Sequence, residues 1–144
     1  MNTVDRTLAS PIHQPSLHES GLKHTTGEAR YVDDLPHPAG MLVGLSVMSP
    51  HAHARILRTD GAAARAVAGV HAVLFAEDIP GENLIGPIFH DEPVLAEGTV
   101  QYHGQIVAFV IGETYDACRE AVALVEVDYE PLPAIMDVAS AREA

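Results

Sequence analysis

The stretch PVLAEGTVQYHGQIVAFVIGETYDACREAVALVEVDYE, which runs from Pro93 to Glu130, changes its hydrophobic period twice. Ile106 to Ile111 form a continuous apolar run rich in β-branched residues, which is typical of a strand buried on both faces. The residues that follow have helical spacing, and from Val125 apolar residues alternate with acidic ones. This order predicts strand, helix and strand, with the first of these strands at the centre of a sheet.

The middle segment has the features of a helix from about Thr114 to Leu124. The Thr114 side chain can cap the first turn, and Asp116 suits the positive end of the helix dipole. The apolar positions on one helical face are Ala117, Cys118, Ala121, Val122 and Leu124. We expect this helix to pack across the sheet through Ala117, Ala121 and Leu124, because small side chains allow a close approach.

Weaker patterns predict the remaining elements. Residues 125–130 should form a strand that Pro131 and Pro133 stop, since proline cannot donate to a ladder. Asp60 should cap a short helix over residues 62–67 that Gly69 ends. Further strands are expected over residues 41–48, in the later part of 49–60, and over 71–75. Residues 21–40 are expected to be loop-like, and residues 76–98 a long irregular excursion with at most short extended pieces.

Composition excludes several classes of protein. The 144 residues allow one domain with a real core, and their formal net charge of −12 repels nucleic acid and anionic membrane surfaces. The single cysteine, Cys118, excludes an internal disulfide and a [2Fe–2S] cluster, which takes four thiolates. No apolar run approaches the roughly 20 residues that span a bilayer. The first 20 residues have no apolar core of a secretory signal. The expected compartment is the cytoplasm.

Four segments together resemble the amino-terminal α/β hammerhead domain of the xanthine dehydrogenase and aldehyde oxidase family, the molybdenum hydroxylases. They are HESGLKHTTGEARYVDDLPHPAGMLVGLSVMSPHAHARI (18–56), VHAVLFAEDIPGEN (70–83), HDEPVLAEGTVQYHGQ (90–105) and VEVDYEPLPAI (125–135). Their order and spacing make this resemblance far more specific than any lone motif. It implies an α+β fold with a mixed sheet and two helices packed on it. It also implies a hammerhead domain over residues 18–144, preceded by a flexible leader over residues 1–17.

The resemblance further implies an activity for a larger protein. Members of the family hydroxylate purines such as xanthine and hypoxanthine, other heterocycles, or aldehydes, with water as the oxygen source. A molybdenum–pterin cofactor takes the hydride, and two [2Fe–2S] clusters pass electrons to FAD. The glutamate base and the pterin-binding loops of the family lie beyond the hammerhead domain. We therefore expect this chain to be a fragment of a molybdenum subunit, inactive when alone and binding no cofactor itself.

Two functions of different class remain open at this point. In the first, the chain is a structural domain whose partners are the remaining domains of the molybdenum subunit and separate FAD and iron–sulfur subunits. A homo-oligomer formed through the exposed interdomain surface is a further option. In the second, the chain is a free-standing hammerhead module for binding or assembly. Nothing in this sequence selects xanthine over an aldehyde or another heterocycle.

Several residues could carry chemistry but have simpler interpretations. His51 and His53 alternate on one face of an expected strand and, with His37 or His90, could bind a metal. No cysteine or HExxH spacing supports such a site. The adjacent acid pairs Asp33–Asp34 and Asp91–Glu92 could act as acid and base, although neighbouring acids in so acidic a chain are usually solvated. We predict no metal ligand and no catalytic residue in this chain.

Two further motifs suggest binding. Gly81 and Gly86 have the spacing of a phosphate-loop pair, but Pro87 stands where the motif needs lysine. Gly104–Gln105 is part of the family pattern and could contact a cofactor. The simpler interpretation is a tight turn whose amide ties down a neighbouring backbone segment. Cys118 is expected to be a small core hydrophobe. We therefore predict no cofactor-binding residue either.

Overall fold

The computed structural model describes residues 17–144, so expectations for the first 16 residues lie outside it. The chain divides into two units, with the boundary after Pro38. The described part of the first unit holds helix α1 (Gly21–Thr26) and the 3₁₀ helix η1 (Val32–Asp34). The expectation of a loop over 21–40 is wrong for α1. Gly27 ends this helix with φ 76° and its N–H bonded to the Lys23 carbonyl. The boundary expected after residue 17 stays a prediction.

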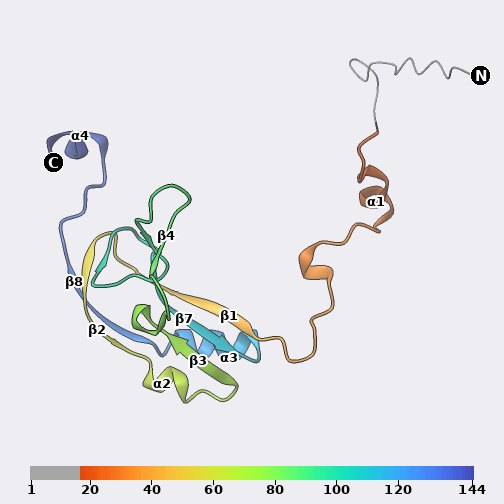
Figure 1. Cartoon of the computed structure of the whole chain (residues 1–144), viewed down its shortest axis with the longest axis horizontal. Coiled ribbons are helices and arrows are strands. Elements are labelled where there is room, and N and C mark those ends of the chain that lie inside the picture. The colour runs from red at the N-terminus through yellow and green to blue at the C-terminus, as the bar shows by residue number, and fades with distance from the viewer. Residues whose placement is uncertain (1–16) are drawn as a thin grey trace, which may run out of the picture. The chain divides into compact units, whose positions relative to one another are not determined.

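The second unit is built around strand β7 (Ile106–Gly112). It lies between β1 (Val43–Met48) and β3 (Val70–Leu74), and both pairings are antiparallel. Helix α3 (Tyr115–Val122) packs across this sheet, as Figure 1 shows, and the short helix α2 (Ala62–Arg65) contacts both β3 and α3. The predicted central strand and the helix that follows it are therefore confirmed.

Strand β7 is buried on both of its faces. Ala108 and Val110 join the core beneath the helices, where Cys118 and Ala121 of α3 also lie. Val107 points to the opposite side and packs with Ala54 in a second core. The remaining members of that second core are Ala96 and Val100. A strand with two covered faces needs apolar residues at successive positions, which explains the unbroken run in its sequence.

The predicted Thr114 cap is confirmed, whereas the N-cap of α2 is Gly61 and Asp60 lies one residue before it, and both helices are shorter than expected. Thr114 Oγ1 accepts from Ala117 N–H at 3.2 Å, and Asp60 Oδ1 accepts from Ala62 N–H at 2.8 Å. Helix α3 ends at Val122, and the Leu124 amide bonds instead to the Ala121 carbonyl in a tighter turn. That turn leaves Leu124 exposed, so its expected packing against the sheet is wrong.

A second antiparallel sheet has β2 (Ala54–Asp60) at its centre, between β6 (Thr99–Val100) and β8 (Glu126–Pro131). Along β8 the apolar residues are half-buried and the acidic ones exposed, as the alternation predicts. Pro131 pairs with Ala54 as the last residue of β8, so the strand ends at the first proline rather than before it. The α+β hammerhead class is confirmed. Its described strands form two three-stranded sheets and one two-stranded sheet, all antiparallel, where a mixed sheet was expected.

Residues 76–98 form the expected excursion with short extended pieces. They contain the 3₁₀ helix η2 (Ala76–Asp78) and the hairpin of β4 (Leu84–Ile85) and β5 (Glu92–Pro93). The last element, α4 (Val138–Glu143), was not expected; its N-cap Asp137 accepts from Ser140 N–H at 2.9 Å. Within residues 17–144, no helix combines the length and apolar character needed to cross a membrane.

Candidate functional site

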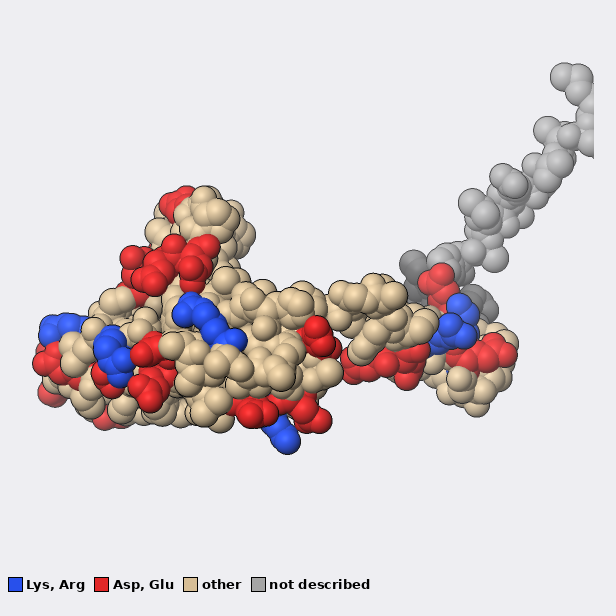
Figure 2. Space-filling view, turned by 90° about the horizontal axis from the view of Figure 1, so that it is seen from below, with Lys and Arg blue, Asp and Glu red and all other residues tan. Residues whose placement is uncertain are grey.

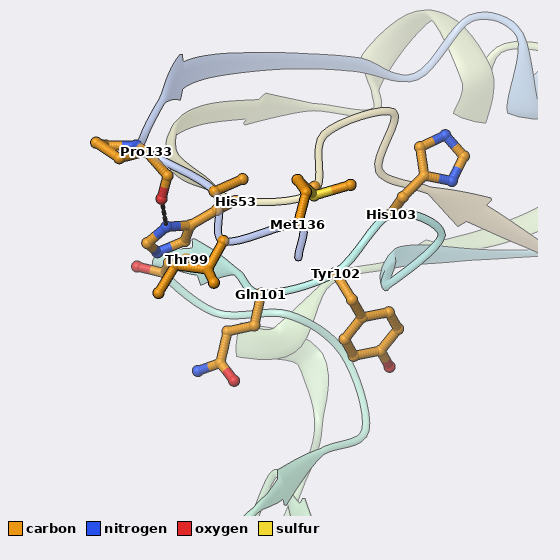
Figure 3. Close-up of a pocket in the computed structure, with 10 residues that line it drawn as sticks. His53, Thr99, Gln101, Tyr102, His103, Pro133 and Met136 are labelled. Carbon is orange, nitrogen blue, oxygen red and sulfur yellow. Dashed lines mark hydrogen bonds between the residues drawn. The ribbon is translucent and has the colours of Figure 1, made fainter. Parts of the chain in front are cut away.

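A pocket of the second unit lies between the segment that follows β8 and the turn before β7. Its volume is about 520 Å³. It is lined by Ala52, His53, Thr99, Gln101, Tyr102, His103, Pro133, Ala134, Ile135 and Met136. Figure 3 shows that the Gln101 and Tyr102 side chains point away from Met136. Because the polar groups do not converge, this pocket lacks the arrangement expected of a catalytic or small-molecule site.

One wall of the pocket is held by His53. Its Nδ1 lies 2.7 Å from the Pro133 carbonyl oxygen, the contact drawn as a dashed line in Figure 3. The His53 carbonyl accepts from Leu132 N–H at 3.0 Å. Neither contact was anticipated, because the two partners are 80 residues apart in the chain.

The other wall is held by Gln105, whose side chain is 3% exposed. Its Oε1 accepts from Gln101 N–H at 2.7 Å, and its backbone carbonyl accepts from Ser49 N–H at 2.9 Å. Gly104 adopts a positive φ of 88° and donates to the Ser49 carbonyl at 2.9 Å. This geometry is the tight turn that the simpler interpretation of Gly104–Gln105 predicts, with the side-chain amide tying down a neighbouring segment.

The structure separates the histidines that were considered as metal ligands. His51 and His53 lie in the turn before β2 rather than in a strand. The His51 ring packs edge-on against Tyr129, with 4.9 Å between ring centroids, and His90 lies 3.7 Å from Glu82 in the β4–β5 region. Among residues 17–144, no three His, Cys, Asp or Glu side chains gather in a metal-binding arrangement. That the chain binds no metal stays a prediction.

The remaining residues that the sequence offered as candidates lie in a 3₁₀ helix, a strand, a turn and the core. Asp34 Oδ2 accepts from Tyr31 N–H at 2.9 Å, across η1, and Glu92 lies exposed in β5. Gly86, with φ 150°, lies in the tight hairpin turn next to the Phe89 backbone. Cys118 is fully buried, and burial raises the pKa of its thiol. Its role as a core residue is confirmed.

Acidic side chains are distributed over the surface, and several engage the few cations, as Figure 2 illustrates for one face. Arg58 of β2 is the clearest case, because its guanidinium lies 2.8 Å from Asp128, 3.1 Å from Glu126 and 3.2 Å from Asp60. The hydrogen bonds that Arg58 donates to Asp128 and Glu126 raise its pKa above the ordinary value. These acids therefore fasten β8 to β2, and the arrangement supplies no free acid–base pair.

Two exposed apolar surfaces stand out from the body of the second unit. At the tip of the β4–β5 hairpin, Ile88 and Phe89 are exposed. Near the C-terminal end, Ile135 and Met136 are exposed and line the same pocket as Tyr102. In the first unit, Tyr31 and Leu35 are also exposed. Exposed apolar side chains that cluster on a surface are typical of interaction sites.

The fold and these surfaces define an α+β domain that presents apolar side chains to solvent. Residues 26–133 match the family described as "Aldehyde oxidase and xanthine dehydrogenase, a/b hammerhead domain", and the chain belongs to that family.

Similar proteins carry the names of oxidoreductases. A xanthine dehydrogenase of Oryza sativa subsp. japonica is 40% identical over 133 residues, which cover 92% of this chain and 10% of that protein. Aldehyde oxidase 4 of Cavia porcellus is 44% identical over 135 residues, again 92% of this chain and 10% of that protein. This chain thus spans about a tenth of the length of these relatives.

Solved structures agree with the sequence relatives. A Cu,Mo-CO dehydrogenase in its carbon monoxide reduced state superposes with a TM-score of 0.79 at 40% identity, over 88% of this chain and 16% of that one. The aldehyde oxidoreductase from Desulfovibrio gigas gives a TM-score of 0.79 at 31% identity, over 85% of this chain and 15% of that one. In each case the matching region is a small part of a larger enzyme.

Proposed function

We propose that this chain is the structural amino-terminal domain of a xanthine dehydrogenase-like molybdenum hydroxylase subunit. The complete enzyme oxidises purines such as xanthine and hypoxanthine, or aldehydes, with water as the oxygen source. The observation that supports this proposal is the family match over residues 26–133. The chain spans about a tenth of the length of relatives named xanthine dehydrogenase and aldehyde oxidase. The expected compartment is the cytoplasm.

The cofactors of such an enzyme are a molybdenum–pterin group, two [2Fe–2S] clusters and FAD. The residues that the structure describes do not fit them as ligands. The single thiol is buried in the core, where it cannot join the four thiolates that a cluster needs. The pocket beside His53 has no converging polar groups. We therefore assign cofactor binding and chemistry to other regions and subunits, and assign to this domain the support of the molybdenum-binding region and of the approach to its active site.

Exposed apolar side chains support this role. Leaving these side chains in water costs free energy that burial against another domain would recover. They are Tyr31 and Leu35 in the first unit and Ile88 and Phe89 in the hairpin. In the complete subunit the molybdenum-binding region of the same polypeptide covers them. The isolated chain should accordingly be colourless and inert toward xanthine, hypoxanthine and aldehydes.

A deletion tests this function directly. Removal of residues 1–144 from the complete subunit should abolish soluble, cofactor-loaded enzyme, measured by molybdenum content and by turnover with an artificial electron acceptor. A merely raised KM would indicate a peripheral role. Turnover by the isolated chain, or full activity of the deletion variant, contradicts the proposal. A chain that is produced without any molybdenum-binding region would support the free-standing module instead.

A further inference from the structure

The HAHAR motif, residues 51–55, fastens the last strand of the domain. The ring of His51 packs on Tyr129, and the guanidinium of Arg55 is paired with the carboxylate of Glu130. Between them, Ala54 is fully buried and pairs with Pro131. Arg55 and Ala54 thus contact consecutive residues at the end of β8, and the His51 ring packs on a third residue of the same strand.

His53 continues this series past the end of the strand, onto the residues that we call the exit segment (132–136). A carbonyl oxygen can only accept, so His53 Nδ1 carries the proton in its 2.7 Å contact with Pro133. Together with the bond from Leu132 N–H to the His53 carbonyl, this contact attaches the exit segment at two points. Proline has no N–H, so neither Pro131 nor Pro133 can donate to a backbone ladder, and the imidazole of His53 adds a side-chain contact to the Pro133 carbonyl.

The attached exit segment presents apolar side chains to solvent. Met136 is 76% exposed and Ile135 55% exposed, and both line the pocket opposite Tyr102, which is 51% exposed. The Tyr102 side of the pocket is independently held by the buried Gln105 amide. Both walls are thus fixed by hydrogen bonds while their apolar side chains lack cover within the described chain.

We propose that His53 is a positioning residue that fixes the direction in which the chain leaves the hammerhead domain. In doing so it sets Ile135 and Met136, with Tyr102, as a docking surface for the molybdenum-binding region of the same subunit. This inference rests on the proposed function. The occupant follows from the length of the relatives, about nine-tenths of which lies outside the matched region, and from the position of this surface on the exit segment itself.

Histidine variants of the complete subunit separate this role from others. His53→Asn keeps an N–H donor near the position of Nδ1, whereas His53→Gln places its donor at the position of Nε2, and His53→Leu has none. His103→Leu is the matched control, because His103 lines the same pocket and no hydrogen bond of its ring occurs in the described part of the chain. The readouts are hydrogen exchange of the Leu132 amide and of residues 134–136, and molybdenum content per subunit.

We expect His53→Leu and His53→Gln to speed exchange in the exit segment about two- to tenfold, the effect of losing one hydrogen bond. Their molybdenum content should fall, while His53→Asn and His103→Leu should match the unmodified subunit. If His53→Leu does not fold, the comparison of Asn with Gln still decides.

Unchanged exchange in His53→Gln would overturn the positioning role. Faster exchange with full molybdenum content would overturn the docking role. An equal loss of molybdenum in His103→Leu would point to a small molecule or a metal in the pocket and would also overturn the inference. A dimer of the unmodified subunit that is lost in the His53 variants would overturn it as well. An unmodified subunit that never contains molybdenum contradicts the proposed function instead, and the exchange measurement then still decides whether His53 fixes the exit segment.

Discussion

Gly112 lies so close to the Cys118 thiol that a Cβ on Gly112 would stand 2.9 Å from Cys118 Sγ. The same Cβ would lie 2.8 Å from the Gly69 carbonyl oxygen, which already accepts from Glu113 N–H at 2.8 Å. The end of β7 is thus enclosed by the start of α3 on one side and by the residue before β3 on the other.

Substitution Gly112→Ala should therefore destabilise the fold by about 1–3 kcal/mol, the usual cost of overpacking a filled core. Neither neighbour can retreat easily, because one is backbone and the other is fully buried. Urea unfolding measures the loss. The control is Gly81→Ala, where a Cβ meets nothing within 4 Å. Equal stability of the two variants would contradict the close packing of β7.

Cys118 should be unreactive in the native protein. Its side chain is fully buried, burial raises the pKa of the thiol, and its Sγ lies 3.4 Å from the Val43 carbonyl oxygen. We expect the reaction with a disulfide reagent such as DTNB to be more than about tenfold slower in buffer than in denaturant. Rapid labelling of one thiol per chain without denaturant would show that α3 separates from the sheet.

Asn83 should stabilise the base of the β4–β5 hairpin. Its Nδ2 donates to the Leu95 carbonyl at 2.8 Å, and its Oδ1 accepts from Leu95 N–H at 3.0 Å. Asn83→Ala removes both partners of a part-buried peptide group and should cost about 1–3 kcal/mol. Asn83→Asp keeps only the hydrogen-bond acceptor, so its stability should lie between those of the unmodified chain and Asn83→Ala. Limited proteolysis of residues 84–93 provides the local measurement, and unchanged cleavage in Asn83→Ala would disprove the role.

Stability should decline in alkali because of Tyr129. Burial raises the pKa of Tyr129 above its ordinary value of 10.0, so the folded chain holds this proton more tightly than the unfolded chain. The contribution of Tyr129 to the free energy of unfolding is complete below pH 10.0 and is lost as the pH rises through the folded-state pKa. Unfolding free energies at pH 9 and pH 11 should differ less in Tyr129→Phe than in the unmodified chain. Tyr115→Phe, at an exposed position, should leave the difference unchanged.

Protein purified without a histidine tag should contain well under one zinc per chain by elemental analysis. The two histidines of the HAHAR motif are engaged elsewhere, His51 with Tyr129 and His53 with Pro133. Nine histidines raise the chance of loose binding, but those within residues 17–144 are not grouped with other metal-binding side chains in a closed site. A stoichiometric metal that also raises the melting temperature would require a different interpretation of these residues.

Features that depend on neighbours in the chain could be predicted from the sequence. The apolar run of β7, the Thr114 cap and the alternation along β8 can each be seen within a few consecutive residues, so their pattern specifies strand or helix directly. The tight turn at Gly104–Gln105 belongs to the same group, because its amide bonds to a residue only four positions away. The resemblance to the hammerhead domain added the fold class.

Only the tertiary structure decided how these elements combine. The strands divide into separate sheets in a way that depends on how they pack. The close approach at Gly112 and the contact of His53 with Pro133 each bring together segments that are distant in the chain. A hydrophobic pattern shows that a residue is buried but does not identify its partner. Likewise, the pattern shows His53 only as a polar residue of an expected strand. The carbonyl that it contacts belongs to Pro133, 80 residues further along the chain, and the pairing of β8 with β2 places the two groups together.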